Sequence, residues 1–598
     1  MKYLLLVFAL VLLFLSSMSQ VIPENRRVNW EAVIDNIIIT QPNNKLDVKD
    51  FGAVGDGITD DHYAIENAIS ALNGSHGYIY FPPGKYLITK SLYLPDSCIL
   101  MGESSNKTTL LFNLNGEAAN CIILSKSQSS DFNDITGGLD MGNNLITVQD
   151  VSSFHIGDVV EIRQKNGDWD VVPIAWADYS VGQITRIKDI YDDNLLLESP
   201  LRINYSADLD PEIRPINTRH SSGIQCLKIH RVDEPAEGSG ANIYMNMAEN
   251  CFVRGVESDT SVGAHISVNS SLNILIDGNS FHHAFKYDGV GMHGYGVALS
   301  KHTSECLITN NIFRYLRHAM MIKTGSNGNI FSYNYSIEPH RSEPIPDASG
   351  DISFHGHYAF SNLWEGNIVQ NIIIDHYWGP SGPFNTLFRN RAELYGIIMT
   401  TSDLIETNSQ NFVGNEVTNT EFLHGMYSLS GTNNFEFGNN ILGEIIPTGT
   451  NNLPDQSYYL SNKPNFWIES LEWPSVGIPI ELGAGTIPAE IRFNTGDVFT
   501  VCPDSSISSV NNQLHELVEI NIWPNPAVSA INISFSYVKS SSLIQIINLV
   551  GDIVLEKKIQ NNHENIIAIP VKNLMNGYYI VVIENVYFIK TEKLIISR

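Results

Sequence analysis

Asparagine recurs along the middle of the chain at a nearly constant interval. Short similar runs such as DGNSF, TNNIF and EGNIV align at eight positions, of which seven are Asn, and five of the seven intervals between them are 23 to 25 residues. A period of this length is typical of a solenoid, because each repeat must stack on its neighbours to bury its apolar residues. The aligned positions are Gly255, Asn279, Asn311, Asn334, Asn367, Asn390, Asn415 and Asn439.

The residue type itself suggests how such coils hold together. An Asn at a tight turn can bond its own backbone and tolerates a left-handed conformation. When identical turns stack, the side-chain amides of successive coils can bond one another as a ladder. The two longer intervals, of 32 and 33 residues, indicate insertions. We therefore predict one coil per repeat and a column of stacked Asn side chains.

The most site-like stretch of the chain lies far upstream, in DFGAVGDGITDDHYAIENAIS at residues 50–70. Its last residues carry apolar side chains at helical spacing, which continue from Ile65 to Leu72 and predict a short amphipathic helix. Asp60 and Asp61 precede that helix, where carboxylates satisfy free backbone amides. A calcium loop would need more oxygen ligands and a distal Glu. We interpret the stretch as a helix cap and not as a catalytic site.

This stretch, followed by GYIYFPPGKYLI at residues 77–88, resembles the N-terminal signature of the pectate lyase-like superfamily, in particular its rhamnogalacturonase and epimerase members. The resemblance implies an all-β fold, a right-handed parallel β-helix over residues 45–500 whose N-terminal end is capped by the helix. It does not imply one reaction, because the same fold supports several chemistries.

Residues 140–215 do not follow the period of the coils. Four runs within them, NLITVQDV, GDVVEIRQ, GQITRIKDI and NLLLESPL, have the composition of short strands separated by turns. We expect a small β insertion between early coils. Trp169 and Trp176 lie inside it, where they can pack in a core or contact a sugar.

The last part of the chain, residues 518–598, changes to short alternating strands and predicts a small β-sandwich. It resembles the C-terminal sorting domain of the type IX secretion system of Bacteroidota, on the runs Pro524-Asn525-Pro526 and Asn576-Gly577-Tyr578-Tyr579 together with Gly551. The resemblance implies passage through the outer membrane by that machinery. A carbohydrate-binding module is the alternative, but it would need an exposed aromatic platform.

The first residues fit an exported protein as well. Lys2 and the apolar run from Leu4 to Leu15 are typical of a signal peptide, which we place at residues 1–19. The net charge of -28 argues against nucleic acid or an anionic membrane as a partner. We expect a secreted or surface-displayed monomer. The six Cys show no zinc-binding spacing, and Cys226 and Cys251 are one repeat apart, so they can stack in the core.

Candidate functional residues follow from the resemblance. In the related family the ligand groove lies on the strand roughly ten to fourteen residues before each Asn turn. This offset falls on GYGVALSKHT, RHAMMIKTG, DISFHGHYAF and IIIDHYWGP, which place basic residues, His302 among them, on four consecutive coils. Alternate strand residues face the core, so one or two of these His are expected to be buried. We predict Lys323, His355, His357, His318 and Asp375 as catalytic residues, and Lys301, Arg317, Asp351, His376, Trp378 and Trp364 as substrate-binding residues.

A basic groove on an acidic protein suits an acidic polysaccharide, and we expect a lyase that acts by β-elimination. A base must remove the C5 proton of a uronate while a cation neutralises its carboxylate. Lys323, with a lowered pKa, or a His is the expected base. Arg317, or a Ca²⁺ ion held by Asp351 and Asp375, is expected at the carboxylate; we expect no other cofactor.

Three alternatives stay open at this stage. An epimerase shares the first step of a lyase and returns the proton to the other face. A glycoside hydrolase needs two carboxylic acids across the bond, and Asp351 and Asp375 lie on adjacent coils, about 5 Å apart if they are in register. A surface-displayed β-helix can also bind a glycan without cleaving it.

Overall fold

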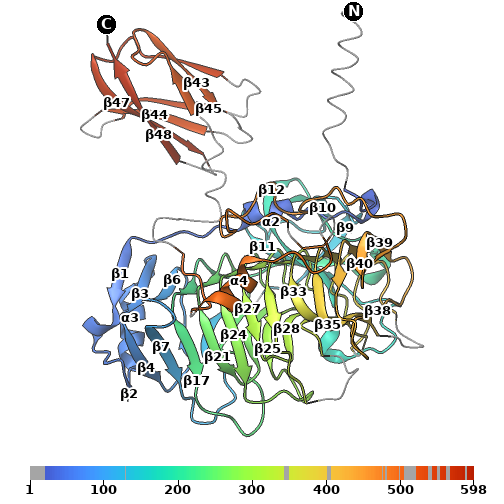
Figure 1. Cartoon of the computed structure of the whole chain (residues 1–598). Coiled ribbons are helices and arrows are strands. Elements are labelled where there is room, and N and C mark those ends of the chain that lie inside the picture. The colour runs from blue at the N-terminus through green and yellow to red at the C-terminus, as the bar shows by residue number, and fades with distance from the viewer. Residues whose placement is uncertain are drawn as a thin grey trace, which may run out of the picture. The chain divides into compact units, whose positions relative to one another are not determined.

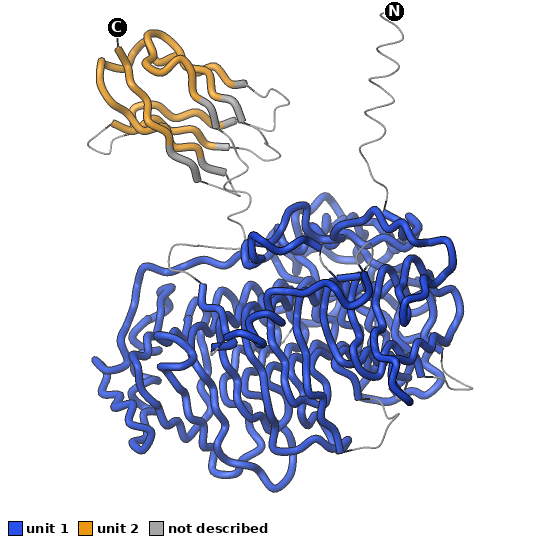
Figure 2. Tube along the Cα trace, viewed as in Figure 1, with its two compact units in different colours: residues 1–504 blue, residues 505–598 orange. Residues whose placement is uncertain are grey.

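The computed structural model describes residues 20–127, 130–342, 349–376, 378–400, 406–474, 476–477, 481–496, 498–503, 520–535, 542–548, 553–559, 566–585 and 589–597. The chain divides into two compact units, residues 1–504 and 505–598 (Figure 2). The predicted signal peptide, residues 1–19, lies outside the described residues. Among the helices that the structure describes, none combines the length and the apolar character needed to cross a bilayer.

The first unit is a right-handed parallel β-helix, as predicted, in which strands of successive coils pair in parallel and form three stacks (Figure 1). The first stack ends at the Asn turns. Its strands are β1 (Asn44–Asp47), β3 (Gly77–Phe81), β6 (Cys98–Gly102), β16 (Gly223–Gln225), β20 (Phe252–Arg254), β23 (Leu275–Asp277), β26 (Leu307–Thr309), β29 (Ile330–Ser332), β32 (Leu363–Glu365), β34 (Thr386–Phe388), β36 (Asn411–Val413) and β39 (Phe435–Phe437).

The second stack follows the Asn turns, and β41 (Glu444–Ile446) pairs antiparallel with its last strand. Its strands are β2 (Asp56–Asp60), β4 (Gly84–Ile88), β7 (Thr108–Phe112), β17 (Lys228–Arg231), β21 (Glu257–Ser261), β24 (Ser280–Ala284), β27 (Ile312–Arg314), β30 (Tyr335–Ile337), the first halves of β33 (Ile368–Ile374) and β35 (Arg391–Met399), β37 (Glu416–Val417) and β40 (Asn439–Ile441).

The third stack completes each coil. Its strands are β5 (Leu92–Tyr93), β8 (Ile122–Ser125), β18 (Ile243–Asn246), β22 (Ala264–Asn269), β25 (Tyr295–Ser300), β28 (His318–Ile322), β31 (Ile352–Phe354), the second halves of β33 and β35, and β38 (Met426–Ser428). Inward side chains of the three stacks form one continuous apolar core along the axis. A short parallel pair, β15 (Arg219–His220) and β19 (Ala248–Glu249), lies beside the coils.

The predicted Asn ladder is present and buried. From Asn279 to Asn439, the Oδ1 of each ladder residue accepts hydrogen bonds from the backbone N–H and the side-chain Nδ2 of the previous one, at 2.8–3.1 Å. One aligned position was off by one residue. The backbone N–H of Val256, not of Gly255, donates to Asn279.

A second ladder, which the sequence analysis missed, runs along the turns before the first stack. Asn329, Asn362 and Asn385 are linked in the same way, and Gln410 and Asn434 continue the column. Two columns of amides therefore fix two corners of each coil in this part of the β-helix.

The helical segments of the first unit are short. Helix α3 (His62–Ala71) buries Ile65, Ala68 and Ile69 against the first coils. Asp60 accepts the backbone N–H of His62 at its start, but Asp61 accepts from the N–H groups of Val54 and Gly55 and so fixes the preceding loop. The other helical segments are η1 (Glu24–Arg26), α2 (Glu31–Asn36), η2 (Val48–Phe51), η3 (Ala175–Ala177), η4 (Ala207–Leu209) and α4 (Pro488–Thr495).

The insertion forms a closed barrel of six strands that starts at Asn133, seven residues before the expected boundary of 140. Buried polar contacts attach it to the β-helix: Arg202 pairs with Glu305, and Glu161 lies 2.9 Å from Nδ1 of His302. His302 thus joins the barrel to the coils and does not face a groove. The strands are β9 (Asn133–Gly137), β10 (Leu145–Val148), β11 (Val159–Gln164), β12 (Val181–Tyr191), β13 (Asn194–Leu197) and β14 (Glu212–Pro215).

A disulfide joins Cys226, beside β16, to Cys502 at the end of the first unit. Cys226 does not stack on Cys251, because the register of β16 and β20 places Cys251 beside Ser222; Cys251 is a free thiol buried in the core.

The second unit is a β-sandwich around its own apolar core. One sheet has the order β42 (Ile520–Trp523), β43 (Ala530–Phe535), β46 (Ile566–Pro570), and the other has the order β45 (Ile553–Ile559), β44 (Ser542–Asn548), β47 (Gly577–Asn585), β48 (Ile589–Ile596).

The ladder gives a direct stability test. The amide of Asn367 accepts from two nitrogen atoms of Asn334 and donates to the carbonyl of Phe331 and to Asn390. Asn367→Ala removes these four buried hydrogen bonds, so we expect a loss of at least about 3 kcal/mol in the free energy of unfolding. Urea denaturation followed by circular dichroism measures it. The exposed Asn106→Ala is the control, expected within about 0.5 kcal/mol of wild type; equal effects of the two variants would contradict a stabilising ladder.

Candidate functional site

A row of polar side chains follows the outer edge of the third stack, where its strands end. Parallel pairing places Asn269 beside Ser300. Backbone hydrogen bonds continue the strand pairing for one residue past the ends of β28, β31 and β33. They place Lys323, His355 and Asp375 at the equivalent position on the next three coils. Neighbouring members are about 4.8 Å apart along the axis. We call these five residues the polar row.

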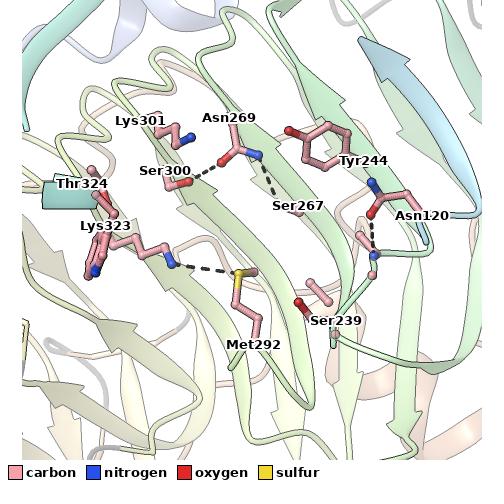
Figure 3. A pocket seen from close by; sticks show the side chains of 15 residues that line it. Asn120, Ser239, Tyr244, Ser267, Asn269, Met292, Ser300, Lys301, Lys323 and Thr324 are labelled. Carbon is pink, nitrogen blue, oxygen red and sulfur yellow. Dashed lines mark hydrogen bonds between the residues drawn. The ribbon is translucent and has the colours of Figure 1, made fainter. Parts of the chain in front are cut away.

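A pocket of ≈ 470 Å³ opens over the first three members of the polar row (Figure 3). Strands β18, β22 and β25 form its floor, and Trp176 reaches it from the barrel insertion. Lys301 and Lys323 contribute two cationic groups, and the described lining residues include no Asp or Glu. The lining consists of Asn120, Trp176, Ser239, Gly240, Ala241, Tyr244, Gly263, Ala264, Ser267, Asn269, Met292, Ser300, Lys301, Lys323 and Thr324.

The two lysines of the pocket have different surroundings. Lys301 is exposed. Lys323 is half-buried, with its Nζ 4.0 Å from the sulfur of Met292 and 5.7 Å from the ring centre of Trp176. Burial lowers the pKa of Lys323, and the positive charge of Lys301 lowers it further. A larger share of Lys323 is therefore a neutral amine, which can accept a proton.

The polar row continues into a His–Asp pair. Nδ1 of His355 lies 2.7 Å from Oδ2 of buried Asp375. A carboxylate at Nδ1 fixes the ring orientation and favours a tautomer with its lone pair on Nε2. The ring of His318 packs 5.4 Å from that of His355 and 4.7 Å from that of Tyr295. Burial, then Arg317 and His355, lower the pKa of His318 strongly, so its imidazole is neutral.

The structure thus brings together Lys301, Lys323, His318, His355 and Asp375 from the predicted set. Trp378 belongs with them: it is half-buried, and its ring lies 6.5 Å from that of His355 and 5.6 Å from that of Trp176. This arrangement supplies a cationic pocket with an aromatic rim and two groups that can transfer protons.

His357 is placed differently from its predicted role. Its side chain is fully buried under the barrel insertion, 5.2 Å from the ring of Trp176 and 6.1 Å from that of Trp169. Burial lowers its pKa. A substrate cannot reach this imidazole, because the insertion folds back over it.

Trp364 is another correction. Its indole lies in the core, stacked on Phe331 at 3.9 Å and near Phe354 at 5.6 Å. Trp364 belongs to β32 of the first stack, so it lies on a different stack from the polar row. The side chain cannot contact a sugar in the groove.

The remaining predicted binding residues are also largely buried. Arg317 packs against Tyr295, with Nη1 3.5 Å from the phenol oxygen. Nδ1 of His376 lies 3.2 Å from the hydroxyl of Thr407, and burial lowers the pKa of His376. Neither lines the pocket, so a role for Arg317 at a substrate carboxylate has no support from its position.

The two acids considered for a hydrolase or a Ca²⁺ site are far apart. Pairing of β31 with β33 places Asp351 before the start of β31 and Asp375 beyond its end, beside His355. Four residues of extended chain separate these levels by about 13 Å. The two carboxylates therefore cannot act across one glycosidic bond at the expected 5 Å or share one ion.

Part of the pocket could have been found from the sequence. The same offset counted back from Asn279 and from Val256 reaches Ser267, Asn269 and Tyr244, which lie on the two coils before those that carry the basic residues. Asn120, Ser239, Met292 and Trp176 come from loops and from the insertion, and no periodic signal marks them.

Comparison with known proteins agrees with this architecture. Residues 46–191 match the family described as rhamnogalacturonase A/epimerase, pectate lyase-like, and residues 521–597 match the secretion system C-terminal sorting domain. Residues 46–191 are a pectate lyase-like segment. This segment runs from β1 to β12, so it includes α3, the first coils and most of the barrel. The type IX sorting domain marks the protein for export, to the cell surface or the medium.

Two curated relatives are similar in sequence to short regions of the chain. The chain is 40% identical over 97 residues to plasmin and fibronectin-binding protein A of Streptococcus pneumoniae, covering 15% of this chain and 13% of that protein. It is 41% identical over 58 residues to mannuronan C5-epimerase AlgE6 of Azotobacter vinelandii, covering 10% and 7%. Among solved structures, the tailspike protein gp49 of Pseudomonas phage LKA1 matches with a TM-score of 0.49 and 13% identity over 62% of this chain and 64% of that one.

Asp351 gives a pH-dependent prediction. Burial raises its pKa from 3.8 to about 6, although the N–H of Gln370 donates to it at 2.7 Å. Between these two pKa values the Asp351 carboxyl is ionised in the unfolded chain and protonated in the folded protein. The free energy of unfolding of wild type therefore falls as the pH rises from about 4 to about 6, and it falls no further above that range. We expect Asp351→Asn to be more stable than wild type by about 2–3 kcal/mol at about pH 8, with most of the difference gone at about pH 4. Urea unfolding at both pH values checks this; a difference independent of pH would contradict it.

Proposed function

We propose that the protein binds an acidic polysaccharide in the pocket of Lys301 and Lys323 and cleaves it by β-elimination. The observation that carries the proposal is the charge of the pocket: two lysines, and no Asp or Glu among its described lining residues, in a chain with a net charge of -28. The N-terminal match to a pectate lyase-like family and the export signal of the sorting domain support an extracellular polysaccharide as the ligand.

The other lining groups suit a sugar. Asn120, Ser239, Ser267 and Asn269 present amide and hydroxyl groups that can bond sugar hydroxyls, and Tyr244 adds an aromatic side chain. A few placed polar groups in a concave site fix the orientation of a ligand. Trp176 and Trp378 form an aromatic edge against which pyranose rings can pack.

The proposed reaction divides the work between the two lysines. The ammonium group of Lys301 pairs with the uronate carboxylate and stabilises the negative charge that develops when C5 is deprotonated. The neutral amine of Lys323 takes the C5 proton. The electron pair of the C5–H bond forms the C4–C5 double bond, and the C4–O bond breaks.

We assign His355 as the acid that protonates the leaving group. It follows Lys323 in the polar row, about one coil away, and Asp375 holds its ring. In its protonated form His355 can give a proton to the departing C4 oxygen, so one group accepts and the other donates. A two-carboxylate hydrolase has less support, because Asp351 and Asp375 are about 13 Å apart along the strand direction.

Lys323→Arg separates binding from chemistry. Arg keeps the positive charge but does not give up its proton near neutral pH, so we expect saccharide binding to persist while formation of unsaturated product falls by about 10²-fold or more. Purified protein is incubated with a panel of uronate polysaccharides, with and without a chelator, and ultraviolet absorbance and reducing ends are followed. Lys188→Ala, an exposed lysine of the barrel, is the control and should match wild type.

The outcomes of this assay distinguish the reaction classes. Undiminished absorbance in Lys323→Arg would exclude Lys323 as the base. Reducing ends without absorbance would mean a hydrolase. Binding with neither signal would mean an epimerase or a glycan-binding protein, and of these two only an epimerase exchanges the C5 proton with deuterated solvent.

Lys301→Ala tests the electrostatic coupling between Lys301 and Lys323. Removing this charge should weaken binding of the acidic saccharide by about tenfold, and it should raise the pKa of Lys323, because Lys301 contributes to its lowering. The rise of kcat/KM with pH would then move to higher pH than in wild type. An unchanged pH profile would contradict the assigned role of Lys323.

A further inference from the structure

A second group of ionisable side chains lies on the outer face of the second stack and contributes nothing to the pocket. Parallel pairing of β17, β21 and β24 places His230, Asp259 and His282 side by side on three consecutive coils. His283 follows directly in the chain. All four side chains are partly exposed.

Three of these residues converge on one point. The Nδ1 atoms of His282 and His283 are 2.9 Å apart, and Nδ1 of His282 lies 3.4 Å from Oδ1 of Asp259. The ligand atoms of the three residues all lie within 4.8 Å of one another. Ligands at about 2.0–2.2 Å from a tetrahedral Zn²⁺ ion are about 3.3–3.6 Å from one another, so small side-chain adjustments bring these atoms to such a geometry.

The backbone explains why two adjacent residues point the same way. Successive side chains of a regular strand alternate between faces, which would place His283 opposite His282. His283 has a φ of 62°, in the left-handed region that non-glycine residues rarely adopt. This backbone conformation at the end of β24 places the ring of His283 on the same side as that of His282. Backbone strain of this kind is found often at functional sites.

A neighbouring carboxylate prepares His282 as a ligand. Its Nε2 lies 3.2 Å from Oε1 of Glu257, and this contact favours the tautomer that is protonated on Nε2 and presents the lone pair of Nδ1. Without a metal, Nδ1 of His283 must donate the proton of the contact between the two rings. Metal binding replaces that contact, and His283 changes to the tautomer protonated on Nε2.

Lys228 and His230 complete the surroundings of Asp259. The Nζ of Lys228 lies 2.8 Å from Oδ2 of Asp259 and 2.8 Å from Glu257, and Nδ1 of His230 lies 3.2 Å from Oδ2. These contacts use the oxygen of Asp259 that faces away from His282. Oδ1 accepts the hydroxyl of Thr260 at 3.0 Å and keeps a second lone pair for a cation.

We propose that Asp259, His282 and His283 bind a divalent transition metal of the Zn²⁺ class, with Glu257 as the positioning residue for His282. Two imidazoles and one carboxylate are a donor set that suits such metals. Ca²⁺ and Mg²⁺ instead prefer sites in which all ligands are oxygen atoms. The ligands come from β21 and from β24, so the ion cross-links two coils of the β-helix. This site is independent of the proposed polysaccharide pocket.

Titration calorimetry of the full chain with Zn²⁺ alone tests the proposal. We expect one saturable site per chain, lost in His282→Ala and in Asp259→Asn. Glu257→Gln should weaken binding by ten- to a hundredfold while keeping the stoichiometry, because it disturbs only the orientation of a ligand. His220→Ala is the matched control, since His220 also lies near a carboxylate, 3.7 Å from Asp96, and it should bind as wild type does.

Two further measurements keep the test decisive if a variant folds poorly. Co²⁺ added to wild type should give the visible absorption bands of a histidine-bound ion, and Zn²⁺ should abolish them. Zn²⁺ should also raise the unfolding temperature of wild type and of His220→Ala. The proposal is overturned if wild type shows no saturable Zn²⁺ site, if His282→Ala binds unchanged, or if Ca²⁺ competes equally with Zn²⁺.

Discussion

The hydrogen bonding of buried asparagine amides is the interaction on which the rest of the β-helix depends. Each tight turn of a coil leaves backbone groups away from water, and these must be satisfied within the protein. The amides from Asn279 to Asn439 do this while linking each of their coils to the next. Because the link is between equivalent residues, it also fixes the register. Lys323, His355 and Asp375 stand in line in the polar row only because that register is kept.

The periodic part of this arrangement could be predicted from the sequence, since a repeated Asn implies a repeated turn. The offset from the turn then placed Lys301, Lys323 and His355 at the third stack, which lines the pocket. Side-chain direction could not be predicted, because a strand with a period of two can be read in either phase. Trp364 is a different error: it lies three residues before Asn367, on β32 of the first stack, and the fold buries it between Phe331 and Phe354.

Other features depend on contacts that no local pattern records. The insertion looked like a few isolated strands, yet as a barrel it covers His357 and extends Trp176 over the pocket. His282 and His283 would face opposite sides of an ideal strand, and only the left-handed backbone at His283 unites them. Tyr244, Asn269 and Met292 are separated along the chain and meet only through the stacking of coils.

The disulfide between Cys226 and Cys502 has a mechanical consequence. It connects residues 276 positions apart, at the point where the β-helix ends and the chain leads to the sorting domain. A pull on the C-terminal unit, as during transport or attachment at a cell surface, is transmitted through the covalent bond to an early coil beside β16. The load therefore bypasses the last coils and the segment that contains α4, and these are not peeled away one after another. The C-terminal tether of the protein is therefore anchored to an early coil of its solenoid and not to the last one.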